Sequence, residues 1–183
     1  MASNDDELIA ALQERAASGK PTDTPTPRER RPPASEETVM KAEAVLGFRL
    51  NPLLRRIYRE VCDGGIGPGY GSLPLMGDES VLSMYENFRS GSWPEKLMPV
   101  WDWGDACWSC VDLEGRIVTN DEHGPTLTEF TTRTWLEAWV GGVNLWKEIY
   151  EDKDATIINP FTKKPIATKV RGTAKGRPWL KVN

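Results

Sequence analysis

The chain has 183 residues, 39% of them hydrophobic and 27% charged, with a net charge of -4 and a mean hydropathy of -0.50. No stretch approaches the ~18 to 20 unbroken apolar residues that cross a bilayer, so a membrane-spanning protein is excluded and one domain with extended ends is expected. Three cysteines and one histidine disfavour a disulfide framework, most His-based catalysis and a His-rich metal site.

The first 34 residues are predicted to form a helix followed by a linker. Leu8, Ile9 and Leu12 recur at helical spacing within Asp5–Ser18. Lys20–Pro33 contains five prolines and almost no large apolar side chain, so we expect a flexible linker. The acidic start of the chain lacks the regions of a signal peptide, which predicts a cytoplasmic protein. The predicted organisation is a helix over 1–19, a linker over 20–34, a folded domain over 35–150 and a basic extension over 151–183.

The folded domain is predicted to begin with three helices, which a glycine-rich turn and a short strand interrupt. Ser35 is placed to cap the first helix, which Gly47 ends, and Asn51 is placed to cap the second. Asp78 is the expected cap of the third helix. The turn requires positive φ at several positions, which glycine adopts readily. The expected elements are helices over 35–47, 51–61 and 79–89, the turn over 63–69 and the strand over 70–75.

After the third helix the pattern changes to short apolar runs separated by turn residues, which predicts a meander of strands. The turn at Leu113-Glu114-Gly115 favours a hairpin. The expected strands lie over 98–103, 107–111, 116–119 and 126–129.

The last strong helix is predicted over Thr132–Tyr150, with Trp135, Trp139 and Trp146 on a wide apolar stripe. Gly141-Gly142 weakens its middle. Beyond this helix the chain is basic and contains prolines, so we expect it to be loosely held, with an added edge strand as the alternative. The residues that suggest this strand are Ile157, Ile158 and Phe161.

The candidate catalytic and metal-binding motifs all lack the necessary context. Cys107 and Cys110 have the spacing of a redox pair or half a zinc site, but they lie inside a predicted strand, so we expect buried thiols. The glycine-rich turn lacks the lysine and the following helix of a phosphate-binding loop. His123 has carboxylates beside it but no candidate nucleophile, which favours a solvated loop histidine. We therefore predict no enzyme activity, no cofactor and no metal.

Acidic residues and tryptophans alternate in the predicted strands. Paired carboxylates can serve glycoside hydrolysis, but no spacing here fixes their separation. Exposed tryptophans with acids around them favour a protein-binding patch, although some of these tryptophans must belong to the core. The acids are Asp102, Asp105 and Asp112, and the tryptophans are Trp101, Trp103 and Trp108.

The charge is divided unevenly along the chain. Residues 63–148 contain 14 acids and 5 bases, a net charge near -9, whereas residues 149–183 contain 3 acids and 8 bases, a net charge near +5. The acidic block disfavours nucleic acid as a target of the core domain and favours a basic partner, while the tail is free to contact something acidic. An acidic surface that serves solubility alone is the plainer alternative.

Several short motifs follow one another in a fixed order between residues 35 and 148. They are Leu46-Gly47-Phe48, Pro52-Leu53-Leu54-Arg55-Arg56-Ile57-Tyr58, the run Gly64-Gly65-Ile66-Gly67-Pro68-Gly69-Tyr70-Gly71, Trp93-Pro94, Asp102-Trp103-Gly104 and Trp108-Ser109-Cys110-Val111-Asp112. In this combination the region resembles the SUKH superfamily, specifically the Smi/Knr-type domain named for a fungal cell-wall assembly regulator.

The resemblance implies an α+β domain with a central, mostly antiparallel sheet packed by helices. It also implies an immunity protein, because bacterial members are mostly antitoxins that bind and neutralise a cognate toxin domain and need no catalytic residue. A non-catalytic regulatory scaffold and an enzyme acting on cell-wall sugar are the alternatives, and the oligomeric state stays open. The residues expected to contact the toxin are Tyr70, Asp78, Asp102, Asp105, Trp108 and Asp121.

Overall fold

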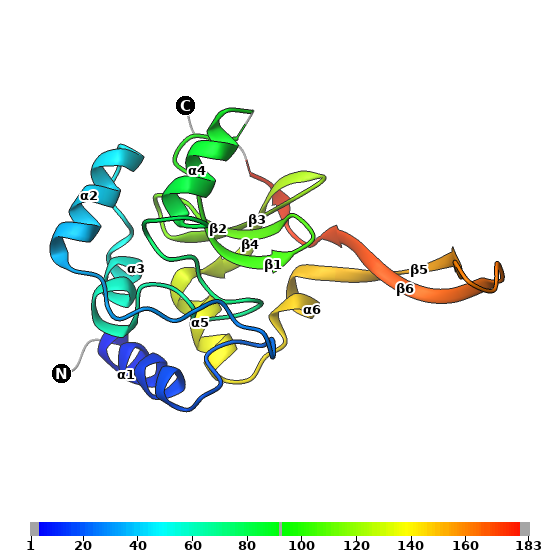
Figure 1. Cartoon of the computed structure of the whole chain (residues 1–183), viewed down its shortest axis with the longest axis horizontal. Coiled ribbons are helices and arrows are strands. Elements are labelled where there is room, and N and C mark those ends of the chain that lie inside the picture. Colours follow the sequence, from blue (N-terminus) through cyan, green and yellow to red (C-terminus); the bar gives the residue numbers. More distant parts are fainter. Residues whose placement is uncertain (1–3, 92, 180–183) are drawn as a thin grey trace.

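The central sheet is built by four strands that follow one another along the chain and pair antiparallel with their neighbours. In the computed structural model, which describes residues 4–91 and 93–179, a short fifth strand joins them from the C-terminal region. Figure 1 shows this sheet in the middle of the molecule, between helices. The order is β1 (Met98–Gly104), β2 (Cys107–Val111), β3 (Arg116–Asp121), β4 (Gly124–Thr131) and β7 (Arg177–Pro178). The predicted α+β class with an antiparallel sheet is confirmed.

The first two helices of the predicted folded domain begin at the predicted caps. The Ser35 hydroxyl accepts the N–H of Thr38 at 3.0 Å at the start of α2 (Glu36–Leu46), and Gly47 ends this helix with φ of 77°. The Asn51 side chain accepts the N–H of Leu53 at 3.1 Å and so caps α3 (Pro52–Arg56). The chain continues directly into the π-helical turn η1 (Ile57–Val61). Because side-chain capping is a local interaction, the sequence indicates these starts well.

Two predictions between residues 70 and 89 are wrong. Ser80, not Asp78, caps α4 (Val81–Arg89): its hydroxyl accepts the N–H of Ser83 at 3.1 Å, and the Ser83 hydroxyl accepts the N–H of Ser80 at 2.9 Å. The strand expected over 70–75 is only an isolated bridge between Ser72 and Trp101. A longer ladder does not form here because the positive φ of the preceding glycines turns the chain and proline lacks an N–H.

The single long helix predicted over 132–150 is two helices. α5 (Thr132–Val140) ends at Gly141-Gly142, and α6 (Leu145–Ile149) begins after Asn144, whose side chain accepts the N–H of Lys147 at 3.2 Å. Val143, which lies within the predicted helix, is in the break with 42% of its surface exposed. The two glycines and the Asn144 cap together favour a new start over a continuous helix.

Tryptophans join the helices to the sheet. Trp135 of α5 is fully buried, and its ring lies 6.3 Å from that of Trp101 and 6.1 Å from that of Trp103, both on β1. Helix α5 also packs against β3 and β4, while α4 packs against β1. The first helix, α1 (Asn4–Ala17), packs against α5 and η1 and buries Leu8, Ile9 and Leu12 in the same core. This N-terminal helix is therefore part of the packed body.

The C-terminal region forms a β-hairpin that projects from the body (Figure 1). Strands β5 (Tyr150–Ile158) and β6 (Pro165–Ala174) pair antiparallel, and neither is paired with another strand among the described residues. We call this hairpin, residues 150–174, the arm. The sequence suggests a loosely held tail or one edge strand here, whereas the structure has a regular two-stranded ladder. Residues 1–3 and 180–183 of the predicted terminal segments lie outside the described residues.

Candidate partner-binding surface

The glycine-rich run forms the turn that the sequence predicts. Gly64, Gly65, Gly67 and Gly69 all have positive φ, between 62° and 109°. The turn is also closely packed: a Cβ on Gly65 would come within 2.8 Å of the Cα of Arg30, and one on Gly67 within 2.3 Å of the Trp101 indole nitrogen. Glycine is therefore needed here for conformation and for space.

The segment predicted as a flexible linker, residues 20–34, lies across this turn, and we call it the strap. The N–H of Gly67 donates to the carbonyl of Pro21 at 2.9 Å, and the N–H of Arg28 donates to the carbonyl of Tyr70 at 3.1 Å. At the end of the strap, the N–H of Ala34 donates to the carbonyl of Tyr58 at 2.8 Å. The backbone polar groups of the turn thus find their partners in the strap, which orders both segments.

A side chain of the strap also reaches the core. The Asp23 carboxylate accepts the indole N–H of Trp139 at 2.9 Å and the backbone N–H of Gly69 at 3.2 Å. One acid therefore links the strap, the turn and α5. This contact explains how the buried Trp139 ring satisfies its polar atom.

Arg28 of the strap is the charged centre of this region. Its guanidinium donates to the Glu79 carboxylate at 2.9 Å and to the Asp102 carboxylate at 2.5 Å. The second oxygen of Asp102 accepts the N–H of Gly104 at 2.8 Å. Asp102 is thus held on both sides, and its side chain is only 15% exposed. Asp102 therefore holds Arg28 and the end of β1 in place and presents little free charge to a partner.

Four of the six residues predicted to contact a partner lie around Arg28. The N–H of Tyr70 donates to the carbonyl of Asp102 at 2.9 Å, and the Tyr70 ring lies over Gly104, next to the exposed Asp105. Asp78 lines a shallow hollow together with Arg28 and Glu79. Tyr70, the only aromatic residue of this group, is 39% exposed. We call Arg28, Tyr70, Asp78, Glu79, Asp102 and Asp105 together the strap surface.

The structure places the other two predicted residues in the core. Trp108 is 9% exposed, and its ring packs edge-on against Phe88 at 5.5 Å. Asp121 is 8% exposed and accepts the N–H of His123 at 2.8 Å in the turn after β3. Neither side chain presents accessible surface in the strap region. The exposed tryptophan patch is also absent, because Trp101 is buried and Trp103 is partly buried against the core.

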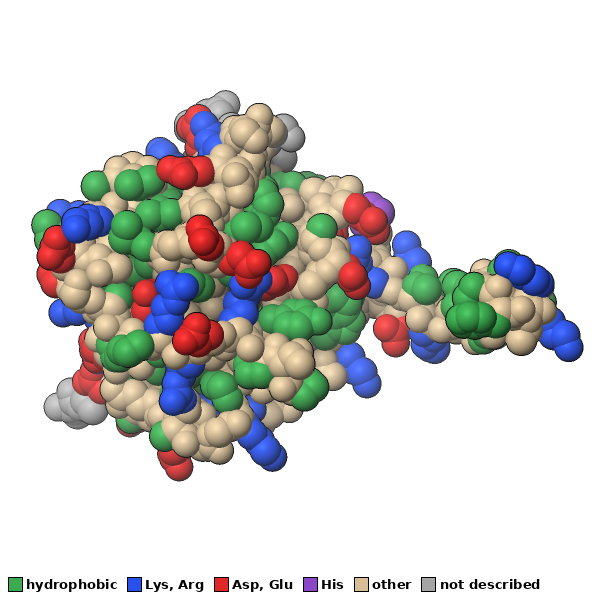
Figure 2. Space-filling view, viewed as in Figure 1, with side chains coloured by type: hydrophobic (Ala, Val, Ile, Leu, Met, Phe, Trp, Pro, Cys, Tyr) green, Lys and Arg blue, Asp and Glu red, His purple; other side chains and the backbone are tan. Residues whose placement is uncertain are grey.

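The acidic block is less acidic on the surface than its sequence suggests. Asp63 is buried and accepts the N–H of Leu75 at 2.7 Å, and burial raises the pKa of this carboxyl. Asp112 is buried and pairs with Arg116 at 2.7 Å. Acidic and basic side chains intermingle over the face seen in Figure 2. The exposed acidity that remains in the strap surface comes from Asp78, Glu79 and Asp105.

The three cysteines are buried, as predicted from their pattern. Burial raises the pKa of the Cys62 thiol to about 12 and keeps the fully buried Cys110 thiol protonated as well. His123 has 54% of its side chain exposed, in the turn between β3 and β4. Within residues 4–91 and 93–179, no group of three His, Cys, Asp or Glu side chains could hold a metal ion.

Arg28 and Glu79 are the members of the strap surface that the sequence analysis misses. The basic run Arg28-Glu29-Arg30-Arg31 in a proline-rich segment is the signal that could have indicated Arg28. Its partner acids lie 51 and 74 residues away along the chain. Only the fold shows that these charges meet.

Comparison with known protein families identifies part of the chain. The model of the SMI1 / KNR4 family (SUKH-1) matches residues 33–137. No curated protein matches the chain. The matched range runs from the end of the strap into α5, so it includes the glycine-rich turn and β1–β4 and leaves out α1 and the arm. In the described part of the chain, no helix is both long and apolar enough to cross a bilayer.

Proposed function

Because the chain belongs to the SMI1 / KNR4 family (SUKH-1), we propose that it is an immunity-type protein that neutralises a cognate bacterial toxin domain by binding it. Bacterial members of this family are mostly immunity proteins. Such a protein acts by covering the toxin, so it requires an accessible recognition surface and no catalytic group. The strap surface is our candidate for that recognition surface.

The observation that carries this choice is an exposed tyrosine on a rigid support, with exposed acids in the same strap surface. Tyr70 is held by the strap on one side and by β1 on the other, through two backbone hydrogen bonds of 3.1 and 2.9 Å. Tyrosine is enriched among the residues that dominate binding energy, because it buries a large area with little loss of side-chain freedom. Asp105 is exposed and follows Gly104, which the Tyr70 ring covers, and Asp78 is exposed in the hollow that Arg28 lines.

The contacts of Arg28 support a partner that presents basic side chains. Its guanidinium already bridges Glu79 and Asp102, so carboxylates are positioned here to bind a planar cation. A basic toxin domain that presents Arg or Lys side chains would pair with the remaining exposed carboxylates. Its association would be accelerated by charge attraction and would weaken as salt is added.

The direct experiment measures binding to a candidate toxin domain from a reading frame that neighbours the gene of this protein. We expect the triple variant Asp78→Asn, Glu79→Gln, Asp105→Asn to bind at least about tenfold more weakly than the wild type, with a shallower dependence on salt. The matched control is the triple variant Glu37→Gln, Glu114→Gln, Glu148→Gln. It removes the same amount of charge from three exposed acids outside the strap surface. Calorimetry of both variants at two salt concentrations gives the comparison.

Equal losses of toxin affinity in the two triple variants would reject the strap surface as the binding site. They would show only a general effect of net charge. Full affinity in the first variant would reject this site as well. A regulatory scaffold is the second candidate function, favoured by the arm as a separate exposed surface. Co-purification separates the two functions, because the scaffold predicts several cellular partners and the immunity protein predicts one.

A further inference from the structure

The arm is a long two-stranded ribbon with most of its surface outside the packed body. Its register pairs Ile157 with Ile166 and Asp154 with Lys169 across the two strands. Ladders of nine and ten residues at about 3.3 Å per residue give the arm a length of roughly 30 Å. The Ile157–Ile166 pair lies directly opposite across the ladder and stabilises it. The result is a ribbon two strands wide that projects from the body (Figure 1).

The base of the arm is fixed to the body. The guanidinium of Arg171 lies over the Tyr150 ring at 5.5 Å and donates to the Glu122 carboxylate at 3.3 Å. Beyond the arm, β7 pairs with β4, and the N–H of Trp179 donates to the carbonyl of Pro125 at 3.0 Å. Both ends of the hairpin are therefore held, and its far end points into solvent.

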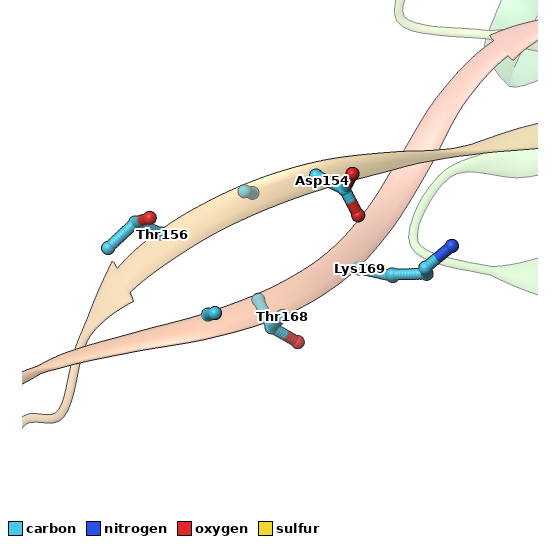
Figure 3. Close-up of a pocket in the computed structure, with 6 residues that line it drawn as sticks. Asp154, Thr156, Thr168 and Lys169 are labelled. Atoms are coloured by element: carbon cyan, nitrogen blue, oxygen red, sulfur yellow. The ribbon is translucent and has the colours of Figure 1, made fainter.

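The charge of the arm is strongly one-sided. Its acids are Glu151, Asp152 and Asp154, all in the half nearest the body, and residues 155–183 contain seven Lys and Arg and no Asp or Glu. Figure 3 shows the middle of the arm, where Asp154 of β5 and Lys169 of β6 mark the change from mixed to purely basic side chains. The basic residues of the arm are Lys153, Lys163, Lys164, Lys169 and Arg171, and Lys175, Arg177 and Lys181 follow it in the sequence.

The far end combines basic charge with an exposed aromatic ring. Phe161 is 91% exposed, and Lys163 and Lys164 follow it in the turn. The Asn159 side chain accepts the N–H groups of Phe161 and Thr162, at 2.8 and 3.0 Å, so the turn has a defined shape. Figure 2 shows hydrophobic and basic side chains together at this end of the molecule.

We propose that the arm binds duplex DNA, with the ribbon lying in the major groove. That groove is about 12 Å wide and admits a two-stranded β-ribbon. The lysines of the turn and of β6 contact phosphates on either side of the groove. Phe161 contacts base edges, where the thymine methyl group offers an apolar partner. This activity belongs to the arm and is separate from the strap surface.

The geometry favours DNA over the other acidic or apolar partners. A membrane would meet only the end of the ribbon, because interfacial segments enter a bilayer by about 5 to 10 Å, and Lys169 and Arg171 would stay out of reach. A second copy packed on one face of the ribbon would bury roughly 300 Å² per partner, far below the ~800 Å² per partner of a stable interface. A duplex lying along the outer part of the ribbon reaches the lysines of the turn and Lys169 of β6 together.

The test uses the full chain and a fluorescently labelled DNA duplex of about 20 base pairs, roughly two helical turns. We expect saturable binding by fluorescence anisotropy at about 50 mM salt, and much weaker binding at about 200 mM. The triple variant Lys163→Gln, Lys164→Gln, Lys169→Gln should bind about tenfold more weakly or worse. The slope of log affinity against log salt should fall by up to about 2.7, since each phosphate contact contributes about 0.9.

The matched control is the triple variant Lys20→Gln, Lys41→Gln, Lys96→Gln, which removes the same charge from exposed positions of the body. It should bind the duplex within about twofold of the wild type. Phe161→Ala should weaken binding without changing the salt slope, because it removes no charge. Circular dichroism and thermal unfolding confirm that all the variants remain folded.

Four outcomes would overturn the proposal. The first is no binding to the duplex at low salt, and the second is an equal loss of DNA affinity in the two triple variants. The third is tighter binding to a single strand of the same length. The fourth is binding to anionic vesicles that is abolished in the arm variant, with no binding to DNA. Concentration-dependent dimerisation without DNA binding would assign the arm to a second copy. None of these results bears on toxin binding, which the variants of the strap surface test separately.

Discussion

Asp63 is an acid that the fold places away from water. It follows η1 and Cys62, and its carboxylate accepts the N–H of Leu75, which fixes the exit of the glycine-rich turn. Burial disfavours the charged form and raises the pKa of this carboxyl, while the hydrogen bond from Leu75 and the charge of Arg31 act in the opposite direction. The side chain therefore stabilises the turn at a cost that depends on pH.

The pH dependence has a defined sign. Because the pKa of Asp63 is higher in the folded than in the unfolded state, the folded protein binds more protons between those two values, and its stability falls as the pH rises through that window. Asp63→Asn keeps an oxygen for Leu75 and cannot titrate. We expect the free energy of unfolding of the wild type, relative to this variant, to increase as the solution is acidified from neutral. Urea unfolding of both proteins at several pH values measures this difference. Parallel curves of unfolding free energy against pH would contradict the prediction.

At the scale of elements, the strap and the glycine-rich turn form one unit. The strap backbone leaves no room for a side chain at Gly65, and the strap has few apolar side chains of its own to hold it there. Each segment therefore depends on the other. Backbone hydrogen bonds and the contacts of Asp23 and Arg28 supply what apolar burial does not.

Two glycines with nearly equal φ allow the free-energy cost of a positive φ to be measured apart from the cost of a steric clash. Gly65 has φ of 77° and Gly142 has φ of 83°, but only a Cβ at Gly65 would meet another segment, the backbone of Arg30 at 2.8 Å. We expect Gly142→Ala to lower the free energy of unfolding by about 1 to 2 kcal/mol, the cost of positive φ alone. Gly65→Ala should cost clearly more and should make the strap more susceptible to limited proteolysis. Equal losses for the two variants would mean that the strap is not packed on the turn.

At the scale of the whole molecule, α1 belongs to the same core as the sheet. Leu12 is fully buried in the cluster that contains Trp135 and Trp139 of α5. Outside this cluster, Arg56 of α3 pairs with Asp6 of α1 at 2.7 Å. A helix that lies before the matched family region thus closes one side of the body.

The contribution of α1 can be measured with two identical substitutions. Leu12→Ala should lower the free energy of unfolding by about 2 to 5 kcal/mol, because it leaves a cavity in the core. Leu113→Ala, at a residue that is 42% exposed, should change it by less than about 0.5 kcal/mol. Chemical unfolding should remain a single transition in both variants. A small effect of Leu12→Ala, or a separate early transition, would show that α1 is an independent appendage.

The sequence predicts those parts of this molecule that depend on neighbours in the chain. The caps at Ser35 and Asn51 and the strands of the meander are local patterns, and the structure confirms them. The packing of the strap depends on pairs such as Arg28 and Asp102, which no local pattern reveals. Strand alternation also does not say which face of a strand is exposed, and Trp108, a predicted partner contact, is buried.

The position of α1 has a consequence for the construction of shortened proteins. A fragment cut at residues 33 and 137 would keep β1–β4 but lose α1, most of the strap, Trp139 and β7. It would expose the apolar surface that those parts cover, and such surfaces favour aggregation. The stretch of chain that relatives share is therefore shorter than the stretch that folds, and expression boundaries for this protein should follow the second.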